Sequence, residues 1–392
     1  MDGAIERSAR EETAQTGTLR SAQVAFDADD PASELARQLG KGPFELVCLF
    51  VSPRADFAAL TGAAQNAFGG ADVIACTTAG ELGRNGYEEG QIIALGFPQE
   101  QFAAHVFEID SLSDMEDQSV IDGLINARLQ LAGRAAEMGS EFACLLVDGL
   151  SMREEHLTSV IASGLGPMPL FGGSSGDGTA FKQTLLSHNG RIMGDAALLT
   201  MVRSHCAVEV FSLDHLVPTK TRMVVTGADP ENRIVHEINA EPAALEYARL
   251  LGKDPNQLSP FIFAAHPVVV RLGDSHHVRA IQRVNENGDL VFFSAINEGM
   301  VLTLADHQDM AEHLDEGLGR LARDRTPDHI LGCDCILRRI EAGQVQQTRE
   351  VSRVLANHRV FGFSTYGEQI GALHVNQTLT GVAIYPPEKS DR

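Results

Sequence analysis

The sequence predicts an α/β protein of two domains, with mixed sheets built from repeated β-α-β-turn-β units and helices packed on the sheets. Apolar runs of strand length alternate with longer stretches of helical periodicity. One short polar motif occurs three times, each time after a strand-like run. A hydrophobic content of 44% is ordinary for a globular protein with a full core. A core made of sheets packed on sheets is the alternative that these patterns leave open.

The repeated motif places two hydroxyl residues shortly before an acid, with glycine between. A strand, a helix and a second strand precede each copy, which indicates a duplicated unit. Because loops at strand ends often carry binding residues, we expect the three turns to rim one shared cleft near the domain interface. The copies are Ala75-Cys-Thr-Thr-Ala-Gly-Glu81, Gly172-Gly-Ser-Ser-Gly-Asp177 and Gly362-Phe-Ser-Thr-Tyr-Gly-Glu368.

In the N-terminal half, residues 1–20 are polar and aperiodic, which predicts a disordered tail. Pro31 after an Asp-Asp pair predicts a helix start, and Asn189-Gly190 favours a hairpin turn. We expect strands over residues 21–26, 44–51, 73–76, 92–97, 103–109, 142–147, 170–172, 183–187 and 192–201. We expect helices over residues 32–39, 57–68, 115–138 and 154–165.

The organisation changes from about residue 205. We therefore predict one domain over residues 21–205 and a second over residues 225–387. In the second we expect helices over 242–251, 308–321 and 348–356, apolar segments over 261–265 and 268–272, and extended segments over 217–226, 233–237, 278–284, 290–295, 330–337, 360–363 and 379–385.

Charge and hydropathy exclude several classes of function. Lys and Arg total 31 and Asp and Glu total 53, so the net charge is −22 and phosphate backbones are repelled. No apolar run approaches the roughly 20 residues that span a bilayer. We therefore expect a soluble cytoplasmic protein that binds neither nucleic acid nor membrane.

The six cysteines do not have the spacing of a secreted disulfide scaffold. Cys333 and Cys335 are the one close pair, and in a strand both sulfur atoms would lie on one face. Packing beneath a sheet is our interpretation, and a metal or redox role stays open.

Two histidines are candidate ligands for a metal or a haem. His266 interrupts an apolar stretch before Pro267, and His374 follows the third motif closely. A neutral imidazole can supply one ligand nitrogen while its other N–H is oriented by an acceptor. A buried, hydrogen-bonded histidine is the alternative for each.

Arg271 and Arg279 lie on strand-like segments with apolar neighbours, where a guanidinium needs an anionic partner. The motif acids Glu81 and Glu368 are candidate partners. A ligand carboxylate or a haem propionate is the other possibility.

Ser174 lies in a formal match to the G-x-S-x-G nucleophile elbow. That elbow requires a helix directly after the serine, and here a hairpin is expected. A hydrolase is therefore a third hypothesis, after the two sensor hypotheses below.

Several segments in order resemble the FIST sensory family, over roughly residues 21–387. Within that family, the third motif and the segment after it are similar to the nitric-oxide-sensing NosP type. The segments are Cys76-Thr-Thr-Ala-Gly-Glu81, Phe171-Gly-Gly-Ser174, Val278-Arg-Ala-Ile281, Asn297-Glu-Gly-Met300, Phe363-Ser-Thr-Tyr-Gly-Glu368 and His374-Val-Asn-Gln-Thr378.

The resemblance implies a sensor without enzymatic activity that binds haem b and nitric oxide. It implies a separate partner, either a histidine kinase or a cyclic-di-GMP enzyme (a diguanylate cyclase or phosphodiesterase), and a homodimer is left open. We predict His266 or His374 as the iron ligand and Arg271 and Arg279 as propionate partners. Tyr366, Glu368 and Asn376 complete the predicted cofactor site.

A sensor of small amino-acid-like ligands without haem is the alternative. Its pocket would use the hydroxyl pairs of the three motifs together with Glu81 and Glu368, because carboxylates suit an amine.

Overall fold

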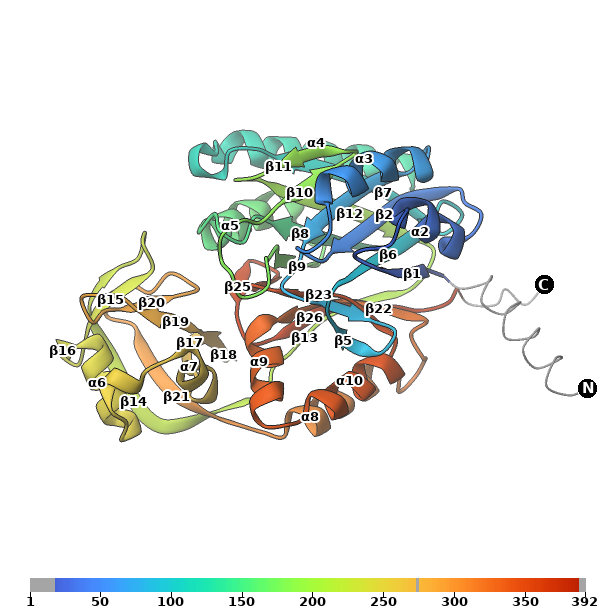
Figure 1. Cartoon of the computed structure of the whole chain (residues 1–392). Coiled ribbons are helices and arrows are strands. Elements are labelled where there is room, and N and C mark those ends of the chain that lie inside the picture. Colours follow the sequence, from blue (N-terminus) through green and yellow to red (C-terminus); the bar gives the residue numbers. More distant parts are fainter. Residues whose placement is uncertain (1–17, 273–274, 388–392) are drawn as a thin grey trace, which may run out of the picture.

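The computed structural model describes residues 18–272 and 275–387. A body of sheets and helices carries a smaller lobe on one side, drawn in yellow to orange on the left of Figure 1. The predicted α/β fold, with mixed sheets and helices packed on them, is confirmed. Residues 1–17 of the predicted tail lie outside the described residues, and Thr18 donates a hydrogen bond to Asp328.

Three six-stranded sheets build the body, and corresponding strands of the repeated unit occupy the same positions in each sheet. The first contains β1 (Arg20–Ala25), β6 (Gln91–Pro98), β2 (Phe44–Val51), β3 (Asp72–Thr77), β10 (Leu186–His188) and β11 (Arg191–Met193). The second contains β7 (Phe102–Ile109), β12 (Ala197–Ser204), β8 (Ser140–Val147), β9 (Leu170–Ser174), β24 (Glu368–Ile370) and β25 (Leu373–Val375). The third contains β13 (Val208–Leu213), β26 (Leu379–Ile384), β22 (His329–Cys335), β23 (Val360–Thr365), β4 (Glu81–Gly83) and β5 (Gly86–Glu88).

Each sheet has one parallel pair, and each is completed by a hairpin from another unit. The parallel pairs are β2–β3, β8–β9 and β22–β23. After each pair the chain passes through the repeated motif and leaves its own sheet. The β4–β5 hairpin joins β23, β10–β11 joins β3, and β24–β25 joins β9. Each unit thus adds its hairpin to the sheet of another unit, which joins the N-terminal and C-terminal parts of the chain. The repetition confirms that the motif marks a unit present three times.

Helices cover the outer faces of the three sheets, and acidic caps begin several of them. The side chains of Asp30, Asp56 and Asp309 accept backbone N–H bonds at the starts of their helices. The covering helices are α2 (Pro31–Leu39), α3 (Phe57–Ala67), α4 (Asp117–Arg134), α5 (Glu154–Leu165), α8 (Met310–Leu321) and α10 (Thr348–Asn357).

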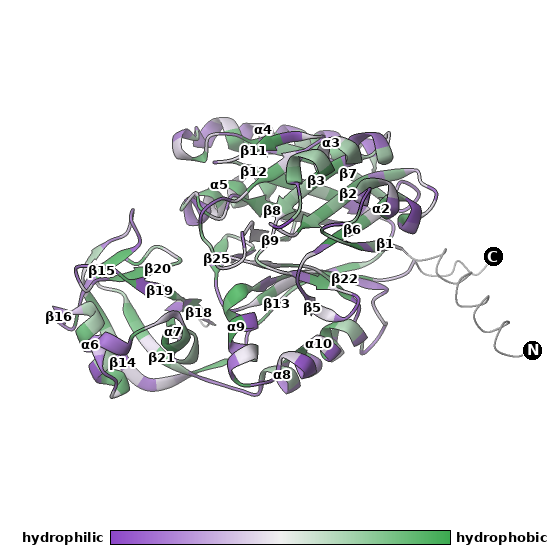
Figure 2. Cartoon of the chain, in the orientation of Figure 1, coloured by the Kyte–Doolittle hydropathy of each residue, from purple (hydrophilic) through white to green (hydrophobic). Residues whose placement is uncertain are grey.

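The inner faces of the three sheets share one apolar core. Phe50 of the first sheet stacks on Phe363 of the third, with ring centroids 4.9 Å apart. The strands are accordingly mostly green in Figure 2, whereas the helices carry purple segments. All six cysteines are buried free thiols, and burial raises the pKa of each. Cys333 and Cys335 therefore agree with the packing interpretation.

The lobe is formed by residues 216–307 around a fourth, eight-stranded sheet. Its own core includes Val225, Tyr247 and Phe263. Its strands are β14 (Leu216–Asp229), β15 (Ile234–Ile238), β16 (Glu241–Pro242), β17 (Val268–Leu272), β18 (Ser275–Arg279), β19 (Ile281–Val284), β20 (Leu290–Phe292) and β21 (Val301–His307), and its α-helices are α6 (Ala243–Leu251) and α7 (Pro260–Ala265).

The structure corrects some of the predicted elements. The strand expected over residues 330–337 ends at Cys335, where α9 (Ile336–Gln344) begins. Ile336 and Leu337 continue the apolar run because the first turn of this helix is also buried. Strands β13 and β21 were not predicted. None of the helices in the described ranges has both the length and the apolar character that crossing a bilayer requires.

Candidate functional site

The three motif turns meet at one place, as expected. We call residues 77–81 turn 1, residues 174–178 turn 2 and residues 364–368 turn 3. Each turn is hydrogen-bonded to the other two through backbone atoms, so the three form a closed ring. The bonds include Ala79 N to Ser364 O at 2.8 Å, Gly176 N to Thr77 O at 3.0 Å and Ser174 N to Gly367 O at 2.8 Å.

The motif acids hold the turns in shape. Glu81 accepts hydrogen bonds from Thr78 Oγ1 at 2.6 Å and from Gln91 N at 3.0 Å, one on each oxygen. Glu368 accepts from Thr365 Oγ1 at 2.7 Å and from Thr378 Oγ1 at 2.9 Å. Burial raises the pKa of Glu368 to about 8. Each carboxyl group thus has one partner in its own turn and one just outside it.

The lobe lies directly on the turn ring. Ala280 and Phe293 of the lobe pack in one apolar cluster with Ala79 of turn 1 and Tyr366 of turn 3. Phe181 stacks on Tyr366 with centroids 4.4 Å apart. The Tyr366 hydroxyl donates to the Asp177 carboxylate and accepts from Asp177 N at 3.0 Å. The predicted cofactor contact Tyr366 thus joins turn 3 to turn 2.

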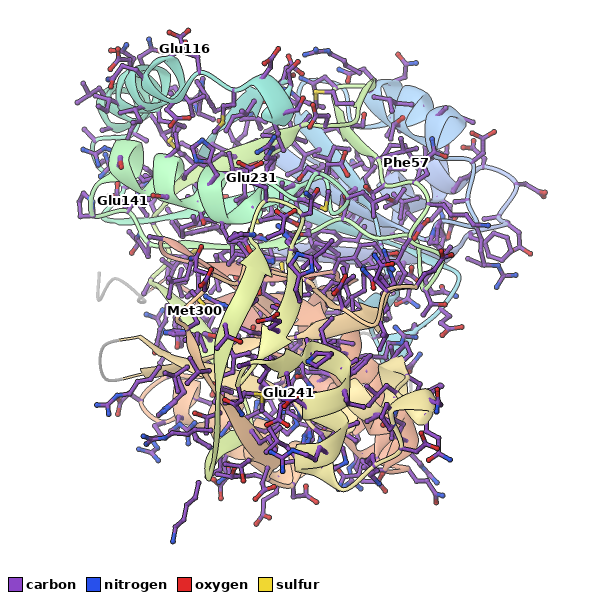
Figure 3. The ribbon with its side chains drawn as sticks, turned by 90° about the vertical axis from the view of Figure 1, so that its left-hand side faces the viewer. Phe57, Glu116, Glu141, Glu231, Glu241 and Met300 are labelled. Atoms are coloured by element: carbon purple, nitrogen blue, oxygen red, sulfur yellow. The ribbon has the colours of Figure 1, made fainter. Side chains whose placement is uncertain are left out.

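A second contact between lobe and body is ionic. Arg233 directly precedes β15 and bonds to Glu154 at 2.5 Å and Glu155 at 2.7 Å, both on α5. Figure 3 shows the neighbouring Glu231 beside the green helix of the body. Glu155 also accepts from Ala295 N at 2.8 Å. These two carboxylates are therefore already paired.

Five buried polar side chains, which we call the turn-3 cluster, lie at the end of β18 in the lobe and on the body segment that follows turn 3. Each is at most 7% exposed. Arg279 Nη1 lies 3.4 Å from the His374 carbonyl oxygen, and Gln369 Nε2 lies 3.4 Å from His374 Nδ1. The members are Arg279 from the lobe and Gln369, His374, Asn376 and Gln377 from the body.

Six atoms of the turn-3 cluster have no hydrogen-bond partner among the described residues. They are Arg279 Nε, Gln369 Oε1, His374 Nε2, Asn376 Oδ1 and Nδ2, and Gln377 Oε1. Each buried polar atom without a partner costs about 1–3 kcal/mol, so such atoms are normally satisfied. Their concentration at one place indicates a site for a polar ligand.

Arg279 gives this cluster a positive charge. Among the described residues, its guanidinium bonds only to the carbonyl oxygens of Val278 at 3.0 Å and His374 at 3.4 Å. Burial lowers the pKa of Arg279, and the charge of Glu155 partly opposes this. Within residues 18–272 and 275–387, no carboxylate lies within ion-pair distance of Arg279. The interpretation that Glu81 or Glu368 pairs with it is therefore wrong.

The other predicted site residues lie elsewhere. His266 ends α7 and is half-buried, with Lys253 and His307 as charged neighbours. Arg271 lies at an exposed position on β17, three residues along the strand from Val268, the register partner of Arg279. The structure thus unites His374, Asn376 and Arg279, and does not bring His266 or Arg271 into the turn-3 cluster.

The surroundings of His374 do not fit a haem in this arrangement. A Cβ built on Gly367 would lie 2.8 Å from His374 Nε2, so turn 3 packs against the nitrogen that would bind iron. Charged and amide groups surround the ring, whereas a porphyrin needs a wide apolar slot. A haem at this position would require turn 3 to move.

Ser174 does not form a nucleophile elbow. No helix follows it, and the chain continues instead to the β10–β11 hairpin. Its hydroxyl contacts Glu154 Oε1 at 3.3 Å and Gln369 Nε2 at 3.1 Å. The carboxylate that accepts from this hydroxyl is already paired with Arg233, and no histidine is hydrogen-bonded to Ser174 in the described residues, so the hydrolase hypothesis receives no support.

Against turn 1 is an open cavity of about 740 Å³, which we call the interlobe pocket. Turn 1 and α9 of the body form its walls, and Phe261 of α7 lies at the lobe side. None of the residues that line it in the described structure is a histidine, cysteine, methionine or tyrosine. The lining therefore offers none of the usual axial ligands of haem iron.

A third polar group lies where the chain crosses between body and lobe. His215 precedes β14 and His307 ends β21, and both contact Glu341 Oε1 on α9 at 2.7 Å. Arg338 Nη1 lies 3.0 Å from His215 Nδ1 and bonds to Asp334 at 2.7 Å. We call these residues the crossover clamp, because the Glu341 carboxylate binds one histidine at each of the two places where the chain passes between body and lobe.

Two histidines and a glutamate also suit a metal ion, and their ligand atoms lie close enough together. The hydrogen bonds of His215 argue against this. Arg338 can only donate, so His215 Nδ1 must accept and the ring proton must be on Nε2. That proton points at Glu341, which leaves Nε2 with no lone pair for a metal.

The clamp predicts a stability that depends on pH through His307. Burial alone would lower the pKa of His307, but its hydrogen bond with Glu341 raises it above 6.5. The stabilisation that protonated His307 gives the folded state is therefore complete below pH 6.5. It is lost as pH rises through the raised pKa of His307. For His215 the pH dependence is reversed, because burial lowers its pKa. Its contribution to stability is lost as pH falls through the lowered pKa.

We expect His307→Gln to lower the free energy of unfolding by about 1–2 kcal/mol below pH 6.5 and by less as pH rises. Urea unfolding at several pH values measures this. His156→Gln, which alters an exposed pair with Asp117, is the control and should leave the profile unchanged. A constant difference at every pH would contradict the ionic role of His307.

Sequence reasoning missed several residues of these groups. Gln369 follows Glu368 and Gln377 follows Asn376, both of them predicted residues, and the polar run from Asn376 to Thr378 is the signal that could have found Gln377. Nothing local marks Glu155, Arg233 or Glu341, because their partners lie far away in the chain.

Comparison with known families divides the chain in two. Residues 45–241 match the family model of the FIST N domain, and residues 243–371 match that of the FIST C domain. The division falls inside the lobe, between β16 and α6. No curated protein matches the chain.

Proposed function

Since the chain belongs to the FIST family, whose domains are sensory, we propose that it senses a small amino-acid-like carboxylate bound in the turn-3 cluster. The observation that carries the proposal is Arg279, a buried guanidinium with no anionic partner in the part of the chain that the structure describes. A ligand carboxylate would supply the missing charge, with Asn376 Nδ2 as a second donor.

The acceptors of the cluster support the amino-acid-like part of the proposal. The side-chain oxygens of Gln369, Asn376 and Gln377 are buried and have no donor in the described structure. An ammonium group carries three donors and no acceptor, which matches this set. This site uses different groups from those first expected, since Glu81 and Glu368 are occupied by the turns.

The position of the site supports a relay through the lobe. Arg279 belongs to the lobe, whereas His374 and Asn376 belong to the body. A ligand that contacts both sides favours the docked arrangement by its differential affinity for it. The receiving partner in this proposal is a histidine kinase, a diguanylate cyclase or a phosphodiesterase.

A haem-bound nitric oxide sensor is the second candidate. The observation that favours it is the buried His374 ring, whose Nε2 has no partner among the described residues and whose pKa burial lowers. A neutral imidazole of this kind is the usual proximal haem ligand. The packing of Gly367 against the ring is the opposing observation.

One preparation tests both candidates. The protein is purified from haem-supplemented cells, its absorption spectrum is recorded, and its melting temperature is measured with each of the standard amino acids. We expect a rise in melting temperature with one or a few amino acids and no haem band that depends on a histidine.

Variants decide the haem arm of this test. A Soret band that is present in wild type and lost in His374→Ala or in His266→Ala would establish the haem sensor with that ligand. The absence of any thermal shift, together with such a band, would overturn the small-ligand proposal.

A further inference from the structure

The interlobe pocket lies where open α/β sheets commonly bind ligands. Ser52 and Pro53 follow β2, and turn 1 follows β3, so the pocket is at the carboxyl ends of a parallel pair. It shares no residue with the turn-3 cluster. Its volume of about 740 Å³ is far more than an amino acid fills and falls in the range of larger organic ligands.

Arg339 is the polar group that the pocket leaves incomplete. Its Nη2 donates to the Glu88 carbonyl at 2.8 Å and lies 3.3 Å from Glu89 Oε1. Its Nη1 is buried and has no partner in the described residues. A Cβ at Gly80 would lie 2.8 Å from Arg339 Cζ, so the glycine lets the guanidinium lie on turn 1.

The carboxylates at the pocket are not available to a positively charged ligand. Glu81 uses one oxygen for Thr78 and the other for Gln91. Glu89 is 81% exposed and lies beside Arg339, where solvent screens it. An ammonium group would find no free buried anion here, whereas an acid group would find Arg339.

Most of the remaining pocket wall is apolar. Ala79, Ile336 and Ile340 form one side, and the ring of Phe261 is 61% exposed on the lobe side. A large exposed aromatic residue next to an apolar cavity is typical of a binding surface. The aromatic or aliphatic body of a ligand would bury both the apolar wall of the pocket and the Phe261 side chain.

We propose that the interlobe pocket is a second binding site, for an organic monoanion with an apolar or aromatic body whose acid group binds Arg339. The site is independent of the proposed amino-acid site. Because Phe261 belongs to the lobe and Arg339 to the body, this ligand also contacts both sides of the interface.

Three isosteres test the charge and the shape: 2-naphthoate, 2-naphthylmethanol and 2-naphthylmethylamine. Each is titrated by calorimetry into the full-length protein. We expect 2-naphthoate to bind with a stoichiometry of one and at least about tenfold more tightly than the alcohol or the amine, the factor that one charge-assisted bond supplies.

Variants locate the site. Arg339→Gln should weaken the binding of 2-naphthoate at least about tenfold. Arg339→Lys should weaken it less, because the lysine keeps the charge. Phe261→Ala should weaken all three probes, and it is safe for folding because the side chain is exposed. Glu89→Gln should strengthen 2-naphthoate slightly, since it removes the competing carboxylate.

The outcomes separate this proposal from the amino-acid site. Arg279→Met should leave 2-naphthoate binding unchanged. Equal binding of the three isosteres, no binding of 2-naphthoate, or unchanged binding in both Arg339→Gln and Phe261→Ala would overturn the pocket proposal. None of these results bears on the amino-acid site, which has its own thermal-shift test.

Discussion

Replacing Asp334 with Ala is expected to lower the free energy of unfolding by about 3–5 kcal/mol, the usual cost of breaking a buried ion pair. Arg338 is only 1% exposed, and its Nε donates to Asp334 at 2.7 Å. Burial alone would lower the pKa of Arg338, but Asp334 holds it above its usual value. Without Asp334 a buried cation is left unbalanced, and the Tyr87 hydroxyl loses its acceptor.

Urea unfolding measures this effect, and two variants control it. Asp315→Ala removes an exposed partner of His358 and should change stability by less than about 0.5 kcal/mol. The double variant Asp334→Leu/Arg338→Met should recover the part of the loss that comes from the unbalanced charge, because an apolar pair needs no balancing charge, whereas Tyr87 and His215 still lose a hydrogen-bond partner. A loss in the double variant as large as in Asp334→Ala would contradict the charge argument.

Replacing Arg279 with Met is expected to abolish the thermal response to the amino acid found in the screen, weakening binding by at least about 100-fold. The same variant should stabilise the ligand-free protein by about 1 kcal/mol, because it removes a buried cation that pairs with no anion among the described residues. Opposite effects on binding and stability would distinguish a ligand contact from a structural residue.

The matched control is Arg283→Met, which alters an exposed arginine of β19, the next strand along the chain. It should change neither binding nor stability measurably. Calorimetric titration gives the affinity and thermal unfolding gives the stability. Full binding by Arg279→Met would contradict the assignment of the ligand carboxylate to this guanidinium.

The repeated motif made the site partly predictable. A polar turn after each strand of a repeated unit is visible locally, and the ring of turns follows from it. Likewise, His374 was singled out because it closely follows the third motif, and the family resemblance added Asn376. Local patterns of this kind can be recognised in the sequence because each involves only the few consecutive residues of one turn.

Long-range pairing was not predictable. The exchange of hairpins joins β4 to β23 although the two are far apart in the chain, and no local signal marks such partners. Arg279 and His374 are 95 residues apart, and their contact depends on how the lobe docks. For the same reason the acids of the motifs looked like partners of Arg279, whereas in the structure they bond to their own turns.

The central claim is that a ligand in the turn-3 cluster bridges body and lobe and thereby changes how the lobe docks. Spin labels can test it, because all six native cysteines are buried and introduced surface cysteines should label alone. Leu129→Cys on α4 and Leu245→Cys on α6 are suitable, since the two leucines are 60% and 50% exposed. The distance distribution between the two labels is measured with and without the amino acid.

We predict that the distribution narrows or shifts when the amino acid is added, and that it stays unchanged when Arg279→Met is present. A distribution that does not change in the otherwise unaltered chain, under conditions where calorimetry shows the site to be saturated, would contradict the claim.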